Sequence, residues 1–268
     1  MCGICGFSGE RDDLTLKRMA DAIVHRGPDD DGYYADGKMN LGMRRLSIID
    51  VETGQQPIHD EERRRWTVFN GEIYNFQALR KELEAKGHRF YTDHSDTEVV
   101  VHLYETYGDA FPNHLNGMFA LALWDMDRER LLLVRDRMGV KPLFFSLVKG
   151  KILFASEIKA ILAHPDYRRD VNHEALYHYF TFKNVPAPLT AFRGIESLLP
   201  GEMLIFERGA VVRKKWWSIC FREEEDPDEE GIQRRIVELL EDATKLRMIS
   251  DVPFGAYLSG GVDSSVIV

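Results

Sequence analysis

Met1-Cys2-Gly3-Ile4-Cys5-Gly6 begins the chain, and residues 2–8 predict a strand of mostly small side chains. Cys2 directly follows the initiator methionine, so removal of that methionine would place the thiol beside its own α-amine. An α-amine with a pKa of about 7.7–8.0 can act as the general base for such a thiol. This arrangement predicts a nucleophilic enzyme that needs no separate histidine.

Two other interpretations of these cysteines stay open. Cys2 and Cys5 form a Cys-x-x-Cys pair, which is typical of redox sites and of half a zinc site. A zinc site needs a second pair of ligands, and Cys220 is the only other thiol in the chain. Both cysteines are otherwise ordinary buried residues of a first strand.

Composition and charge exclude several classes of protein. The chain has 268 residues, with 44 acidic against 35 basic side chains and a net charge of −9. This balance disfavours nucleic acid as a partner, because phosphate binding needs clustered cations. We find no apolar run near the roughly 20 residues of a membrane helix and no signal peptide. Few cysteines and no leader predict a soluble, cytoplasmic protein.

Apolar periodicity predicts short strands joined by tight turns, with helices to cover their faces. This mixture predicts an α+β fold built on antiparallel sheets. Helices are expected at 14–24, 76–87, from Asp96 onward, at 156–164 and at 172–182. Strands are expected at 2–8, 39–49, 66–70, 118–125, 131–135, 143–147, 152–155, 202–207 and 210–217.

A change of composition divides the chain. Residues 223–230 hold seven acidic side chains and one proline, a run that repels itself and favours a solvated linker. An amphipathic helical stripe follows from Ile232 to Leu246, and then an apolar strand is expected at 252–258. We therefore predict one domain over 2–217, a linker over 218–230, and the first part of a second domain over 231–268.

Several longer motifs occur in order after the N-terminal one. They are His25-Arg26-Gly27-Pro28-Asp29, Arg44-Arg45-Leu46-Ser47-Ile48-Ile49-Asp50, Phe69-Asn70-Gly71-Glu72-Ile73-Tyr74-Asn75, Ser95-Asp96-Thr97-Glu98 and Arg135-Asp136-Arg137-Met138-Gly139-Val140-Lys141-Pro142-Leu143. Together these motifs resemble the class II glutamine amidotransferases, and among them the glutamine-hydrolysing asparagine synthetases. The resemblance implies a four-layer αββα N-terminal-nucleophile hydrolase sandwich, followed by the start of an incomplete α/β ATP-pyrophosphatase domain.

The resemblance also implies roles for the residues around Cys2, the implied catalytic nucleophile. Asn70 and Gly71 would donate hydrogen bonds to the oxyanion, each typically worth about 2.7–4 kcal/mol. Taken alone, this Asn-Gly pair is equally typical of a tight turn. Arg45 would hold the α-carboxylate of glutamine through a two-pronged contact. Its neighbour Arg44 must face the other way on a strand, and only the motif selects between the two.

The remaining glutamine-binding roles fall on two carboxylates. Glu72 and Asp96 would receive the α-ammonium group, although Asp96 is also a plausible helix N-cap. Arg26 would line or support the site. Met43 is a departure, because related sequences often have histidine there; it weakens assignment to a subfamily but has no role in the glutaminase chemistry.

A second motif lies near the last residues of the chain. Ser259-Gly260-Gly261-Val262-Asp263-Ser264-Ser265 is not a Walker loop, because no lysine closes it. It resembles the pyrophosphate loop of enzymes that form an adenylate from ATP, in which consecutive small residues offer backbone N–H groups to a phosphate. By itself such a run is more often an ordinary turn. The resemblance implies an Mg²⁺ ligand in Asp263 and ATP-binding residues in Leu258, Ser259, Gly260, Gly261, Asp263 and Ser264.

The predicted function is glutamine hydrolysis at Cys2, with the ammonia used for ATP-dependent, AMP-forming amidation of aspartate to asparagine. The expected cofactors are ATP and Mg²⁺ for the full-length enzyme and none for the glutaminase half. One alternative keeps the glutaminase and changes the acceptor to another carboxylate, such as a sugar acid. Another is a non-catalytic binding module. Glutamine, ATP and aspartate are the expected partners, and a homodimer is compatible with the sequence.

Overall fold

The structure, a computed structural model, describes residues 2–221 and 228–268 and divides into two compact units, Met1–Ser218 and Ile219–Val268. The predicted linker at 218–230 overlaps helix α6 (Glu229–Leu246) at its end. Most of the acidic run at 223–230 lies outside the described residues. The two units are treated separately below.

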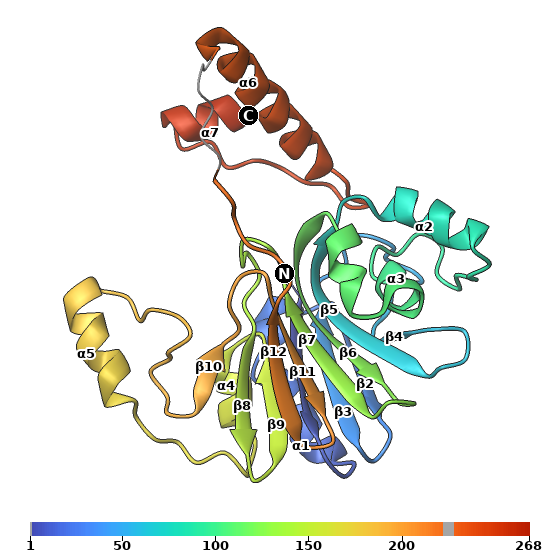
Figure 1. Ribbon diagram of the computed structural model, residues 1–268, viewed down its shortest axis with the longest axis vertical. Coiled ribbons are helices and arrows are strands. Elements are labelled where there is room, and N and C mark those ends of the chain that lie inside the picture. The colour runs from blue at the N-terminus through green and yellow to red at the C-terminus, as the bar shows by residue number, and fades with distance from the viewer. Residues whose placement is uncertain (1, 222–227) are drawn as a thin grey trace. The chain divides into compact units, whose positions relative to one another are not determined.

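Two six-stranded sheets form the first unit, and every pair of neighbouring strands in them is antiparallel (Figure 1). The first sheet has the order β10 (Ile195–Ser197), β8 (Phe144–Val148), β9 (Lys151–Ala155), β1 (Gly3–Ser8), β3 (Met39–Arg45) and β2 (Asp30–Ala35). The second has the order β12 (Ala210–Lys215), β11 (Glu202–Glu207), β7 (Arg130–Arg135), β6 (Gly117–Asp125), β5 (Arg65–Ile73) and β4 (Ile58–His59).

Strand β1 shows why the sheets stack. Its residues are buried on both faces, because successive side chains point to opposite sides of the sheet. Ile4 joins a core that contains Met43 of the first sheet and Val68 of the second. Cys5 and Phe7 point the other way, into an apolar cluster formed with helix α1 (Asp13–Asp21) and helix α4 (Ile158–Leu162). One strand therefore contributes to two successive layers of the core.

The same alternation separates the two N-terminal cysteines. Cys2 packs against the core between the sheets, whereas Cys5 is fully buried in the cluster on the other face. Burial raises the pKa of the Cys5 thiol to about 12. The pair therefore forms neither a redox centre nor half a zinc site, and Cys5 is a structural residue.

Helices on the two outer faces complete the four layers. Asp12 starts α1 by accepting a hydrogen bond from the Thr15 amide at 2.9 Å, and α1 packs on β1 and β3. Helix α2 (Phe76–Ala85) lies beside α3 (Val99–Tyr107), which packs against β5 on the other side of the molecule (Figure 1). Helix α5 (His173–Phe182) and the short helices η1 (Val24–Arg26) and η2 (Gly108–His114) occupy connections. The predicted α+β sandwich is confirmed.

Some predicted boundaries are wrong. The strand expected over 39–49 ends at Arg45, and β2, β4 and β10 were not anticipated. Asp96 does not cap α3: the helix begins at Val99, and the Asp96 carboxylate instead accepts a hydrogen bond from the Ile73 amide at 2.9 Å. The Asp96 carboxylate therefore accepts from an amide distant in the sequence rather than from an amide of the helix that follows it.

The second unit contains α6 and α7 (Val262–Ile267). The predicted helix from Ile232 to Leu246 is present, but the strand expected at 252–258 is not. A strand is stable only when a neighbour pairs with its backbone groups, and no described strand pairs with this segment. None of the described residues in this unit is buried.

Candidate active site

A cavity opens at one end of the sandwich, where β1 begins, β3 ends and the middle of β5 passes. The cavity has a volume of about 50 Å³ and is partly open to solvent. The cavity is lined by Cys2, Arg45, Leu46, Ile48, Ile49, Gly54, Gln56, Phe69, Asn70, Gly71, Glu72, Ser95, Asp96, Thr97 and Lys141. All six residues predicted to bind or transform glutamine are in this set.

Cys2 is held in place by the backbone of Leu46 and by the side chain of Arg26. The Leu46 amide donates to Sγ at 3.5 Å, and Sγ lies 3.6 Å from the Leu46 carbonyl oxygen. The Arg26 Nε donates to the Cys2 carbonyl oxygen at 2.9 Å. Burial raises the pKa of the Cys2 thiol, and the Leu46 hydrogen bond opposes that shift. The thiol therefore needs a base to become a nucleophile at neutral pH.

Arg26 supports the nucleophile rather than lining the cavity. Its Nη1 donates to Glu157 Oε1 at 3.0 Å. Burial opposes ionisation of Glu157, but hydrogen bonds from Arg26, Lys159 and His25 lower its pKa to about 2. Glu157 therefore stays charged and holds the guanidinium that positions the Cys2 carbonyl group.

Arg45 and Arg44 lie on opposite faces of β3. Arg44 pairs with Asp21 and Asp31 outside the cavity. Arg45 is 4% exposed and donates from Nη2 and Nη1 to the carbonyl oxygens of residues 49–51 at 2.6–3.2 Å. Among the residues that the structure describes, no carboxylate forms an ion pair with Arg45. These carbonyl groups hold the buried Arg45 guanidinium in place. Its other N–H groups can bind a carboxylate ligand.

Asn70 and Gly71 lie in the middle of β5, opposite Ala120 and Phe119 of β6, so the tight-turn interpretation is wrong. The Asn70 side chain is fully buried, yet neither its Oδ1 nor its Nδ2 has a hydrogen-bond partner in the described structure. A buried amide without partners costs about 1–3 kcal/mol. A Cβ at Gly71 would lie 2.2 Å from the Met118 carbonyl oxygen, so only glycine allows this pairing.

Glu72 and Asp96 bring two carboxyl groups to the same cavity. Burial raises the pKa of Asp96 to about 7; hydrogen bonds from Ile73 and Thr97 oppose the shift, and the charge of Glu72 adds to it. A group with this pKa changes charge close to neutral pH. A bound cation beside both carboxylates would favour the ionised form.

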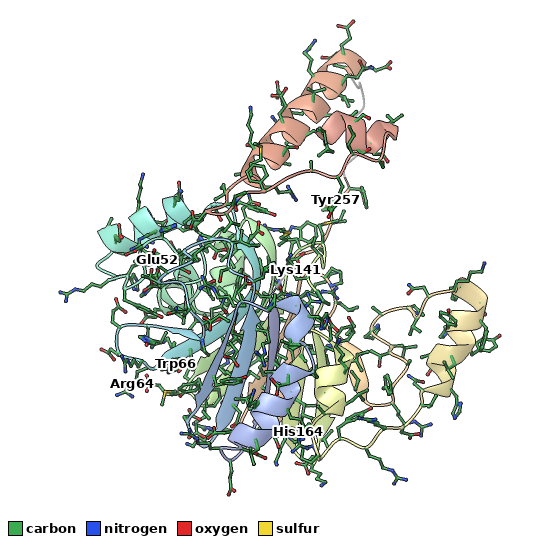
Figure 2. The ribbon with its side chains drawn as sticks, turned by 180° about the vertical axis from the view of Figure 1, so that it is seen from behind. Glu52, Arg64, Trp66, Lys141, His164 and Tyr257 are labelled. Atoms are coloured by element: carbon green, nitrogen blue, oxygen red, sulfur yellow. The ribbon has the colours of Figure 1, made fainter. Side chains whose placement is uncertain are left out.

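Lys141 and Gln56 line the cavity but were not predicted as site residues. Figure 2 labels Lys141. Lys141 is 5% exposed, and burial lowers the pKa of its ammonium group. Lys141 lies within the motif at 135–143. A lysine flanked by small and apolar residues is the one feature of the sequence that could have indicated a buried cation there. Gln56 Oε1 accepts a 2.6 Å hydrogen bond from the Phe69 amide, a contact that no local pattern indicates.

Met43, the departure from the family pattern, is fully buried in the core between the sheets and does not line the cavity.

The residues predicted to bind ATP belong to the second unit. Ser259 Oγ and Ser264 Oγ lie 2.8 Å apart, and Gly260 has a φ of +78°. Leu258 and Asp263 are exposed.

Comparison with protein families agrees with this geometry. Residues 1–217 match the family described as glutamine amidotransferase domain, and residues 235–268 match the family described as asparagine synthase. The chain belongs to the glutamine amidotransferase family. The resemblance inferred from the motifs is confirmed.

Relatives that match nearly the whole chain are longer proteins. The chain is 40% identical to asparagine synthetase [glutamine-hydrolyzing] 1 of Bacillus subtilis, and the match covers 100% of this chain and 43% of that protein. It is 36% identical to the amidase chyE of Penicillium rubens, over 94% of this chain and 37% of that protein. The chain thus spans less than half the length of these relatives.

Solved structures support the fold. Glutamine phosphoribosylpyrophosphate amidotransferase from B. subtilis matches 81% of this chain and 49% of its own, with a TM-score of 0.60 and 21% identity. The described helices of the amidotransferase chain include none that is both long and apolar enough to span a membrane.

Proposed function

We propose that this chain hydrolyses glutamine at Cys2 and that its first unit is a glutaminase. One observation carries the proposal: the Asn70 amide is fully buried without partners in the cavity that Cys2 and Arg45 also line. Such an amide is a ready-made donor for charge that develops on a substrate, because its cost is already part of the folded state. Membership of the amidotransferase family supports the same reaction.

In the proposed first step, the Cys2 α-amine, freed by removal of Met1, takes the thiol proton. The sulfur then attacks the side-chain amide carbon of glutamine, and the carbonyl electrons move to an oxyanion near Asn70 and Gly71. Collapse of this intermediate transfers the proton to the amide nitrogen and releases ammonia, leaving a γ-glutamyl thioester on Cys2. Water then attacks the thioester, which releases glutamate and restores the thiol.

The substrate is oriented by charges at the other end of the cavity. Arg45 binds the α-carboxylate, while Glu72 and Asp96 bind the α-ammonium group. Opposite charges at both groups discriminate an amino acid from a simple amide. Lys141 adds a buried cation to the lining, and we assign it no step.

For the full-length protein, we propose that the ammonia serves an ATP- and Mg²⁺-dependent amidation of aspartate to asparagine. The match of 235–268 to the asparagine synthase family and the names of the Bacillus relatives support this acceptor. Residues 258–264 would bind the ATP phosphates, with Asp263 as a magnesium ligand. We also propose a cytoplasmic location and a homodimer. Light scattering on the full-length protein tests the homodimer.

The glutaminase proposal is tested by glutamate release from glutamine. Cys2→Ala should abolish it, whereas Cys220→Ala, which removes an exposed cysteine, should leave the rate unchanged. Intact mass must show that Met1 is absent from the active protein. Undiminished release by Cys2→Ala, or full activity with Met1 retained, would refute the mechanism.

The acceptor is tested with the full-length protein supplied with glutamine and ATP. Aspartate should yield asparagine together with AMP and pyrophosphate. Formation of the amide of a sugar acid, with aspartate inert, would support the alternative acceptor and leave the glutaminase proposal intact.

A further inference from the structure

A second group of polar side chains gathers outside the glutamine cavity, where the segment between β4 and β5, the segment after α2, and α3 meet. The group consists of Glu61, His88, His102 and Glu105. One nitrogen or oxygen atom from each lies within 4.8 Å of the others. None of the four residues lines the cavity at Cys2.

The distances within this group match those between the ligands of a small metal ion. Glu105 Oε2 lies 3.2 Å from His102 Nδ1 and 3.3 Å from His88 Nδ1. His102 Nδ1 lies 3.7 Å from Glu61 Oε2. Tetrahedral zinc, with bonds of about 2.0–2.2 Å, separates its ligand atoms by roughly 3.3–3.6 Å. These three pairs are close to that spacing, and all pairs lie within 4.8 Å, so the side chains must move closer together to bind such an ion.

The outer nitrogens of both histidines face acceptors. His88 Nε2 lies within hydrogen-bond distance of Thr106 Oγ1, at 2.9 Å. His102 Nε2 lies 3.5 Å from Glu98 Oε1 and is buried without a hydrogen-bond partner in the described structure. A histidine that binds metal through one ring nitrogen usually donates a hydrogen bond from the other to such a group. The Arg65 Nη1 also donates to Glu105 Oε1 at 2.9 Å, which leaves Oε2 directed at the centre of the group. Both imidazoles are therefore oriented with Nδ1 inward.

We propose that Glu61, His88, His102 and Glu105 form a structural zinc site. Two imidazole nitrogens and two carboxylate oxygens suit Zn²⁺, whereas Mg²⁺ and Ca²⁺ prefer oxygen ligands alone. The two carboxylates balance the charge of the ion. In the structure, which holds no ion there, the His102 ring lies beside Glu98 and Glu105.

The ion would connect three segments that are separate in the sequence. His102 and Glu105 belong to α3, whose first residue, Val99, follows Asp96 by three positions. Fixing α3 to the segments at Glu61 and His88 would therefore steady the chain that carries Asp96 to the cavity.

The test uses the chain in a Cys2→Ala/Cys220→Ala background, so that neither accessible thiol can bind metal. Calorimetry should show one Zn²⁺ per chain and much weaker binding of Mg²⁺. Thr106→Val, which removes an outer acceptor, should weaken zinc binding by about 10–100-fold. His88→Ala should weaken it further. His173→Ala, at an exposed histidine of α5, is the matched control and should bind zinc like the parent.

Two further readouts separate a metal site from a general effect on folding. Zinc should raise the Tm of the parent and of His173→Ala but not that of His88→Ala. Cobalt bound in place of zinc should give tetrahedral d–d absorption. Equal zinc affinity in the parent and His88→Ala, or no binding by the parent, would overturn the proposal.

Discussion

The cavity at Cys2 and the loop at 258–264 have equally recognisable motifs, but their surroundings differ. Cys2, Arg45, Asn70 and Asp96 come from separate parts of the chain and meet in a cavity at one end of the sandwich. The loop residues bond mainly to one another, as in the contact between Ser259 Oγ and Ser264 Oγ. A motif becomes a binding site when distant elements bring complementary groups to it.

Burial shows the same difference in energetic terms. Arg45 and Asp96 are 4% and 6% exposed, so their charges interact in a medium that screens them weakly. Asp263 is exposed, so water competes for whatever it binds. Within this chain, single substitutions in the cavity at Cys2 are therefore expected to change ligand binding or activity. Single substitutions in the loop at 258–264 are expected to change neither. Four predictions test that contrast.

The largest expected effect concerns Asn70. Asn70→Ala should lower kcat for glutamine hydrolysis by about 10²–10³-fold with little change in KM, because the donor acts on charge present only in the transition state. Its stability should not fall greatly, since the amide removed has no partner to lose. Asn113→Ala, at an exposed position, is the control. Unchanged kcat in Asn70→Ala would contradict the oxyanion role.

A smaller effect on glutamine binding is expected from the change in charge of Asp96 with pH. Because its pKa is raised to about 7, the carboxylate is ionised above pH 7 and gains a proton below it. Glutamine binding to Cys2→Ala, measured by calorimetry, should therefore weaken by up to about tenfold per pH unit below pH 7. Affinity is preferable to rate here, because the α-amine also titrates near this pH. Asp96→Asn should bind weakly at every pH; a retained pH dependence would assign it to another group.

A site residue could be predicted from the sequence where its role is indicated by the residues next to it in the chain. Arg45 and Asn70 lie in long motifs, so matching the motifs located both. Lys141 lies in a motif too, but nothing local shows that its ammonium group is buried beside Cys2. Asp96 was placed in the site, yet its acceptor partner proved to be the Ile73 amide rather than its own helix.

The fold shows the same limit. Strand β1, with its small side chains, and helix α2, with its regular apolar pattern, were both predicted. Strand β2 reads Asp-Asp-Gly-Tyr-Tyr-Ala and has no buried residue, because it lies at the edge of its sheet. Its pairing with β3 comes from register across the turn rather than from its own composition. The segment 252–258 is the reverse case: its apolar pattern predicts a strand, but the described chain offers no partner.

A still smaller effect is expected when the second unit is removed. A chain that ends at Ser218 should keep kcat/KM for glutamine within about twofold of the parent, because every residue lining the cavity precedes that position. The Tm of the first unit should also stay the same. A large loss of activity with unchanged Tm would show that residues after 218 act on the glutamine cavity.

The smallest expected effect is that of ATP on this chain. Calorimetry should show no binding tighter than about 1 mM, because a nucleotide site in a parallel α/β domain is formed by several strand-helix units, whereas residues 252–258 form no strand here. Asp263→Asn should therefore change nothing in this chain but should impair ATP binding in the full-length protein. Micromolar affinity in the parent chain would show that the loop binds ATP without further elements, and the contrast between the cavity at Cys2 and the exposed loop would then fail.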